Sequence, residues 1–192
     1  MVKSSLSSPR RVCWYGKLPA RGDFVGRGLP PRWRSDWDGW LQRGLALAAR
    51  TTDGETLRER LCSFAPWRYV ALPAAGETWC GIVIASHDRV GRAFPLTLVE
   101  RIDAPGSQDE SWVRLSALLD AVAQGPEALE AVIAALPARA GLAVEFLHPL
   151  PPAPGSLWWP LGASRDAAAR SAAWPPEPEL LLELAGVTDK ER

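Results

Sequence analysis

Two apolar runs near the middle of the chain carry the clearest strand signal. Residues 80–85 and 94–99 are rich in β-branched and other apolar side chains, and a polar segment separates them. Such runs are typical of neighbouring strands joined by a tight connection. Ile82, Val83 and Ile84 follow one another without a polar residue, as in a strand that is covered on both faces. We therefore predict a central sheet with helices on both sides.

Further strands are predicted before this pair. Residues 12–15 form a short apolar run, and residues 24–25 either return to a strand or pin the preceding loop to the core. Residues 67–72 form another run, and Gly76 lies in the short connection that follows. A connection of this length is typical of a hairpin, so the order is antiparallel.

The last third of the chain gives weaker signals. Residues 142–147 are compatible with a strand, and residues 156–160 predict a last short strand. Pro160 places that strand at an edge of the sheet, because proline has no N–H to donate. The alanine-rich residues 163–173 predict a helix that is exposed or absent.

Apolar side chains three and four residues apart predict a long helix that begins near Pro31. The residues on this stripe are Trp33, Trp37, Trp40, Leu41, Gly44, Leu45 and Ala48. A buried tryptophan removes roughly 150–250 Å² from water, so the stripe is interpreted as a core face. The alternative is a helix on a membrane surface, but the mixed charges on its polar side weaken attraction to lipid.

The same periodicity predicts two more helices, from residue 107 to 125 and from 126 to 136. Residues 55–61 are expected to form a short helical turn or two, and residues 179–184 a terminal helix. Ser107 and Glu110 have the spacing of a capping box, which begins a helix by satisfying two backbone N–H groups. Pro126 fits the first turn of the next helix, where no hydrogen-bonded N–H is needed.

The length predicts one domain or at most two small ones. Residues 1–11 lack periodicity and are expected to be a disordered leader, and residues 187–192 a frayed tail. Residues 12–186 are expected to form a single domain. The predicted fold class is α/β in the broad sense and α+β more narrowly, with a central, mostly antiparallel sheet and helices packed on both faces.

The charge balance gives no general attraction to polyanions. Lysine and arginine number 22, and aspartate and glutamate also number 22. The net charge is therefore zero and favours neither nucleic acid nor an anionic membrane. The sequence shows no signal peptide and no apolar run long enough to span a bilayer. We expect a soluble cytoplasmic protein without stable membrane insertion.

The residues with reactive side chains form no catalytic pattern. Ser86, His87 and Asp88 are adjacent in sequence, but members of a catalytic triad usually come from separate segments. Neither His87 nor His148 has a partner at a spacing that suits zinc. The three cysteines lack C-x-x-C spacing, so buried thiols are favoured over redox or metal roles. We predict no catalytic residue, no metal and no cofactor.

Charged side chains gather in two segments beside the predicted sheet. They are Lys17, Arg21 and Asp23 in one segment, and Asp88, Arg89 and Arg92 in the other. In one interpretation Asp23 or Asp88 pairs with a neighbouring arginine and ties its loop down. In the other the six residues form a surface that contacts a partner. The two interpretations are compatible.

Five different short motifs occur along the chain in a specific order and spacing. They are GKLPARGDFV at residues 16–25, DGWL at 38–41, PWR at 66–68, DRVGRAFPLT at 88–97 and SLWW at 156–159. Together they resemble the TagF family, also called ImpM, of type VI secretion system-associated proteins. The resemblance extends from about residue 12 to residue 184.

The resemblance implies a non-enzymatic cytoplasmic regulator. Such a protein represses the contractile secretion apparatus after translation by binding the forkhead-associated scaffold protein of the system. The six loop residues are then candidates for the partner-binding surface. Two alternatives stay open: a small hydrolase or nucleotide-binding enzyme that uses His87, Asp88 and Arg92, or a structural subunit of the apparatus. The oligomeric state stays open as well.

Overall fold

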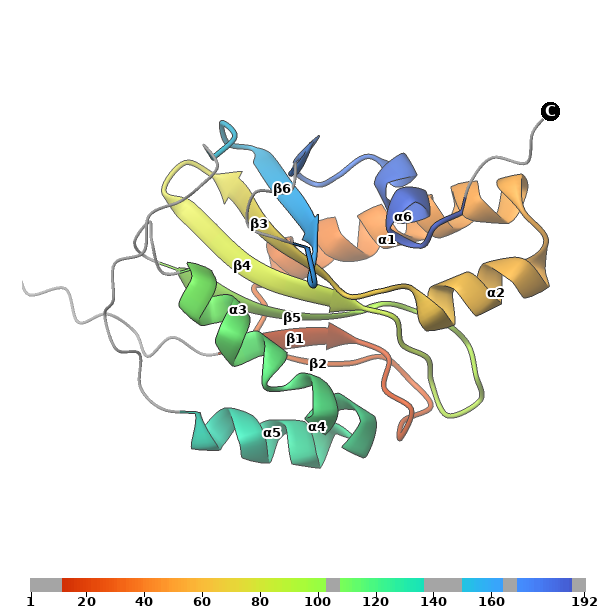
Figure 1. The fold of residues 1–192 in the computed structure, drawn as a ribbon, viewed down its shortest axis with the longest axis horizontal. Helices are drawn as coiled ribbons and strands as arrows, with labels where there is room; N and C mark the ends of the chain where they lie inside the picture. Colours follow the sequence, from red (N-terminus) through yellow and green to blue (C-terminus); the bar gives the residue numbers. More distant parts are fainter. Residues whose placement is uncertain (1–11, 103–107, 137–149, 164–168, 188–192) are drawn as a thin grey trace, which may run out of the picture.

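A computed structural model describes residues 12–102, 108–136, 150–163 and 169–187 of the chain. Within these residues one antiparallel sheet is flanked by helices, which confirms the predicted fold class (Figure 1). The strands are β1 (Val12–Gly16), β2 (Val25–Arg27), β3 (Trp67–Ala74), β4 (Glu77–Ile84), β5 (Leu96–Ile102), β6 (Gly155–Pro160) and β7 (Arg170–Ala173). Their order across the sheet is β2-β1-β5-β4-β3-β6-β7.

Helices cover both faces of the sheet. One face carries α1 (Pro31–Thr51), α2 (Gly54–Ser63) and α6 (Pro178–Leu184), and the other carries α3 (Gln108–Ser116), α4 (Leu119–Gln124) and α5 (Pro126–Ala135) (Figure 1). None of these described helices combines the length and the apolar character that a bilayer crossing requires.

The consecutive apolar residues of β4 lie where the sequence predicts them. Ile82 and Ile84 pack in the cluster beneath α3–α5, whereas Val83 packs in the cluster beneath α1 and α6. Side chains alternate between the two faces of a strand, so an unbroken apolar run fits a strand that helices cover on both sides.

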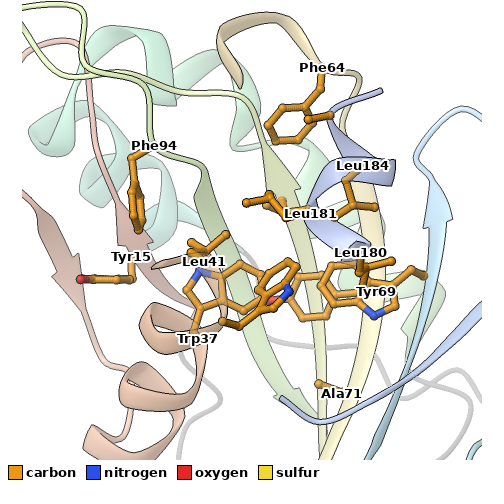
Figure 2. Packing of buried hydrophobic residues seen from close by; sticks show 14 of the residues in the cluster. Tyr15, Trp37, Leu41, Phe64, Tyr69, Ala71, Phe94, Leu180, Leu181 and Leu184 are labelled. Carbon is orange, nitrogen blue, oxygen red and sulfur yellow. The ribbon is translucent and has the colours of Figure 1, made fainter. Parts of the chain in front are cut away.

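A tryptophan cluster joins α1 to the sheet, which confirms the core interpretation of its stripe. Trp33, Trp37 and Trp40 are all buried. The ring centroid of Trp37 lies 5.1 Å from that of Trp33, 4.9 Å from that of Trp40 and 5.3 Å from that of Tyr69 on β3. Figure 2 shows Trp37 and Tyr69 side by side in this cluster. Rings at these separations contribute contact energy beyond their buried area.

The C-terminal helix α6 closes the same cluster. Leu180, Leu181 and Leu184 point into it (Figure 2), and the Trp40 Nε1 donates a hydrogen bond to the Glu177 carbonyl at 3.1 Å. At Gly44, an added Cβ would lie 2.7 Å from the Leu181 Cδ2. The absence of a side chain at Gly44 therefore allows α1 and α6 to pack closely.

One prediction for the C-terminal third is wrong. The strand ending at Pro160 lies inside the sheet, between β3 and β7. Pro160 is tolerated there because the described pairing of β6 with β7 ends at Trp158. On the other side, the Leu161 N–H donates to the Pro66 carbonyl and continues the pairing with β3 past the proline. For the alanine-rich residues 163–173 the sequence leaves two outcomes, an exposed helix or none. Residues 170–173 form a strand, which agrees with the second outcome for these four residues. Backbone pairing with β6, reinforced by the hydroxyl of Ser156 donating to the Ala173 carbonyl at 2.9 Å, outweighs the helix propensity of alanine.

Two element boundaries also differ from the prediction. The helix expected from residue 107 to 125 is divided into α3 and α4, and at the break the Leu118 N–H bonds three residues back to the Leu115 carbonyl. Strand β5 begins at residue 96 and not at 94, so residues 85–95 form a longer loop than the predicted tight connection. Residues 1–11, the Ser107 capping box, the strand expected at 142–147 and residues 188–192 lie outside the described residues.

The close approach at Gly44 predicts the effect of one added methyl group. In Gly44→Ala the new methyl group overlaps Leu181, and we expect a loss of about 1–2 kcal/mol in unfolding free energy after the gain in helix propensity is counted. Gly39→Ala is the matched control on α1, because its Cβ meets only the end of the flexible Arg43 side chain. This control gains up to about 1 kcal/mol. Equal denaturation midpoints for the two variants would refute the close packing of α1 on α6.

Candidate interaction surface

Two loops from distant parts of the chain meet at one end of the sheet. Residues 17–24 follow β1 and residues 85–95 precede β5, and these two strands are antiparallel neighbours. The Arg89 N–H donates to the Arg21 carbonyl at 2.8 Å, and the Ser86 hydroxyl donates to the Lys17 carbonyl at 2.6 Å. The loops lie side by side in Figure 1. We refer to residues 17–24 and 85–95 together as the two-loop surface.

A buried carboxylate holds the two loops together. The Asp88 side chain is 0% exposed and accepts four hydrogen bonds from three residues. The donors are the Lys17 Nζ at 3.0 Å, the Arg92 Nε at 2.7 Å, and the backbone N–H groups of Val90 at 3.1 Å and Arg92 at 2.9 Å. The bonds from its own loop form a turn typical of aspartate, and Gly91 permits this turn with a φ of +80°. The bond from Lys17 attaches the other loop.

These bonds set the ionisation of Asp88. Burial alone would raise the pKa of this carboxyl group, because the charged form loses its hydration. The hydrogen bonds from the Arg92 backbone, the Lys17 side chain and the Arg92 side chain, together with the positive charge of Lys17, outweigh that effect. The pKa of Asp88 therefore lies well below its usual range, and the carboxylate stays ionised at neutral pH.

The six predicted site residues fall into two groups. Lys17 and Asp88 are buried and bond to each other. The other four are exposed to solvent, namely Arg21, Asp23, Arg89 and Arg92. Arg92 bonds to Asp88 and to the Gly22 carbonyl, while its side chain remains 62% exposed. The predicted pairing of Asp88 with a neighbouring arginine is confirmed. Partner binding by the exposed residues stays a prediction.

Helix α5 contacts both the first loop and the neighbouring strands β1 and β2. Arg21 pairs with Glu127, and Arg27 pairs with Glu130, at the start and in the middle of α5. Glu130 also accepts a hydrogen bond from the Trp14 Nε1 at 2.9 Å. These partners are more than one hundred residues apart in sequence, and no periodicity in the sequence indicates their pairing. The first loop is therefore attached both to the second loop and to α5.

Sequence reasoning missed the apolar part of the two-loop surface. Phe24 packs against Phe94, with ring centroids 4.5 Å apart, and stacks on Tyr15 at 5.9 Å. Phe24 thus pins its loop to the core, as one interpretation of the sequence expects, but 44% of the side chain remains exposed. Val90, in the second loop, is 68% exposed. The only sequence signal for these positions is that each apolar residue lies among polar neighbours in a loop.

The residues of the alternative enzymatic site do not form a catalytic arrangement. The Ser86 hydroxyl donates to a backbone carbonyl and Asp88 is held by Lys17 and Arg92, so neither bonds to His87. His148 lies outside the described residues. Among the residues that the structure places, no group of three or more His, Cys, Asp and Glu side chains is arranged to hold a metal ion.

The role of Asp88 predicts a pH-dependent stability difference. Asp88→Asn removes the charge that Lys17 and Arg92 face, and we expect the melting temperature at pH 7 to fall by about 5–10 °C. Since the folded pKa is depressed, the stabilisation by Asp88 is fully present above the usual aspartate range. It is lost as the pH falls below that range. The difference between wild type and variant should therefore shrink between pH 5 and pH 2.5.

The exposed Asp23 provides the control for this experiment. Asp23→Asn removes a charge from the same surface without removing a buried interaction, so its melting curve should match that of the wild type at every pH. If Asp88→Asn also had the melting temperature of the wild type at every pH, the carboxylate would not hold the loops together.

One comparison with known proteins identifies a family, and another finds a similar crystal structure. Residues 13–141 match the N-terminal domain of TagF, described as type VI secretion system-associated. The crystal structure of PA0076 from Pseudomonas aeruginosa PAO1 is similar to this chain, with 30% sequence identity and a TM-score of 0.68, and the match covers 94% of this chain and 97% of that one. No curated protein matches. The chain therefore belongs to the TagF family of type VI secretion system-associated proteins.

Proposed function

We propose that this chain is a non-enzymatic, cytoplasmic regulator that represses type VI secretion after translation by binding the forkhead-associated scaffold protein of the system. Membership of the TagF family supports the connection with this secretion system. The forkhead-associated partner and the repressive role follow the family resemblance of the five motifs. The two-loop surface is the proposed contact.

One observation carries the proposal: a buried ionic interaction joins two distant loops into a single exposed surface. Lys17 and Asp88 are buried and bond to each other, while Arg89 and Arg92 remain exposed to solvent. A surface held in place before binding loses little conformational entropy when a partner docks. Such a surface suits recognition of another macromolecule.

The state of Asp88 favours binding over the enzymatic alternative. A general base must be able to accept a proton near the working pH. The Asp88 carboxylate is fully buried and engaged by Lys17 and Arg92, and its pKa is depressed by those contacts. A carboxylate in this state is a poor proton acceptor at neutral pH and a good structural tie.

Charge reversal on the second loop tests the proposed contact. Arg89→Glu should weaken binding of the purified chain to the purified scaffold at least about tenfold, because the partner then meets a negative charge. Its melting temperature should stay within about 2 °C of the wild type, because surface ion pairs contribute little to stability. Calorimetric titration and a thermal melt measure the two effects. Parallel losses of binding and stability would mean that the loop only maintains the fold.

Arg50→Glu is the matched control, since Arg50 is also exposed but lies in the last turn of α1. It carries the same charge change and should bind the scaffold as the wild type does. Overproduction in the native host extends the test to repression: the wild-type chain and Arg50→Glu should lower the amount of secreted tube protein, whereas Arg89→Glu should not. Unchanged secretion on overproduction of the wild type would count against repression. Stable co-purification with baseplate proteins would instead favour a structural subunit.

A further inference from the structure

Two exposed apolar side chains lie on the two-loop surface. Of the large apolar side chains in the described part of the chain, three are exposed: Phe24 at 44%, Val90 at 68% and Val113 at 72%. Val113 lies on α3, whereas Phe24 and Val90 lie on the two loops that hydrogen bonds join. Scattered exposed hydrophobic residues are normal on protein surfaces. Two of them on a surface fixed by a buried carboxylate indicate a more specific role.

The ring of Phe24 is held in one orientation. Phe94 meets it edge-on and Tyr15 stacks beside it, and Figure 2 shows Phe94 and Tyr15 at one edge of the buried cluster. The Lys17 Nζ lies 5.2 Å from the centroid of the Phe24 ring, and the Arg34 guanidinium lies 4.5 Å from that of Tyr15. The exposed part of Phe24 is thus the outer end of a supported aromatic stack. Because the ring is already ordered, it loses little conformational entropy when a partner contacts it.

Val90 is positioned by the same carboxylate that joins the loops. Its backbone N–H donates to Asp88 at 3.1 Å, so the residue lies on a fixed turn although its side chain is exposed. Phe24 reaches Asp88 through Lys17, which contacts both. One buried group is therefore linked to both residues, directly to the backbone of Val90 and through Lys17 to the ring of Phe24.

The charged side chains around these two residues are mostly positive. The exposed charged residues of the two loops are Arg21, Arg89, Arg92 and the single acid Asp23. Arg21 pairs with Glu127 on α5, and Arg92 shares the buried Asp88 with Lys17. Arg89 and the exposed part of Arg92 therefore carry the positive charge that this surface offers to a partner. An apolar centre with a charged rim is the usual composition of a protein interface, and arginine and aromatic residues are enriched there. The complementary partner surface is apolar and acidic.

We propose, on the basis of the proposed function, that the scaffold contacts this surface through a segment that carries an apolar side chain flanked by carboxylates. Phe24 and Val90 contact the apolar side chain, and the carboxylates pair with Arg89 and with the exposed part of Arg92. A second copy of this chain does not fit, because a two-fold contact of this surface with itself sets arginines against arginines. Two apolar side chains also provide little area for insertion into a bilayer.

Two valine substitutions test the proposal with matched chemistry. Val90→Ser and Val113→Ser remove the same apolar atoms from two positions of nearly equal exposure. Val90→Ser should weaken binding of the full chain to the purified scaffold about tenfold, whereas Val113→Ser should change it less than twofold. Neither should shift the melting temperature by more than about 2 °C, because both side chains are exposed. Phe24→Ala should weaken binding about thirtyfold or more, with its melting curve measured in parallel.

The salt dependence of binding tests whether the partner segment carries carboxylates. Raising sodium chloride from 0.05 to 0.5 M should weaken binding of the wild type, because screening removes the attraction between arginine and carboxylate. Vesicles of anionic lipid and a random DNA duplex serve as probes for other polyanions, and neither should compete with the scaffold.

The outcomes separate this inference from the function on which it rests. If the wild-type chain does not bind the scaffold at all, the proposed function fails and the inference falls with it. If the wild type binds but Val90→Ser and Val113→Ser bind equally well, the inference is overturned while the proposed function stands. Competition by vesicles that Val90→Ser abolishes would overturn it in favour of a lipid surface.

Discussion

A carboxylate that is buried on folding requires hydrogen-bond donors from the protein. In this protein the donors to the buried Asp88 carboxylate join two loops at one end of the sheet. Asp88 finds its donors on its own turn and on Lys17, which follows the first strand. The bond is possible only because β1 lies beside β5 in the sheet, so that the two loops emerge together. The exposed charges and rings of the two-loop surface owe their positions to this buried interaction.

The aromatic core makes the base of the surface rigid. Trp37 packs between α1 and the sheet, and α6 closes over the same cluster through Leu181 and its neighbours. Tyr15 and Phe94 belong to this core and also support Phe24 from below. Protein cores are packed as densely as organic crystals, so side chains that pack against a core have little freedom to move. The same aromatic packing that stabilises the fold therefore also presents the surface.

Local patterns predict part of this arrangement from sequence. The spacing of the tryptophans predicts α1, and the unbroken run at Ile82 predicts a strand buried on both faces, because each signal depends on neighbouring residues. The pairing of Asp88 with Arg92 is also local. The bond from Lys17 spans 71 residues and depends on strand order, which no local pattern fixes. The interior position of β6 and the strand at residues 170–173 likewise follow from sheet pairing, which overrides the character of Pro160 and of the alanines.

The exposure of Phe24 escapes sequence reasoning for a related reason. A phenylalanine in a loop is expected to turn inward, and Phe24 does so in part, but 44% of the residue remains exposed to solvent. The central claim is that the two loops form one contact surface. Hydrogen–deuterium exchange of the chain with and without purified scaffold tests it most directly. We predict protection of backbone amides in residues 17–24 and 85–95 together, with little change on α3. Protection of only one loop, or of α3 with neither loop, would contradict the account.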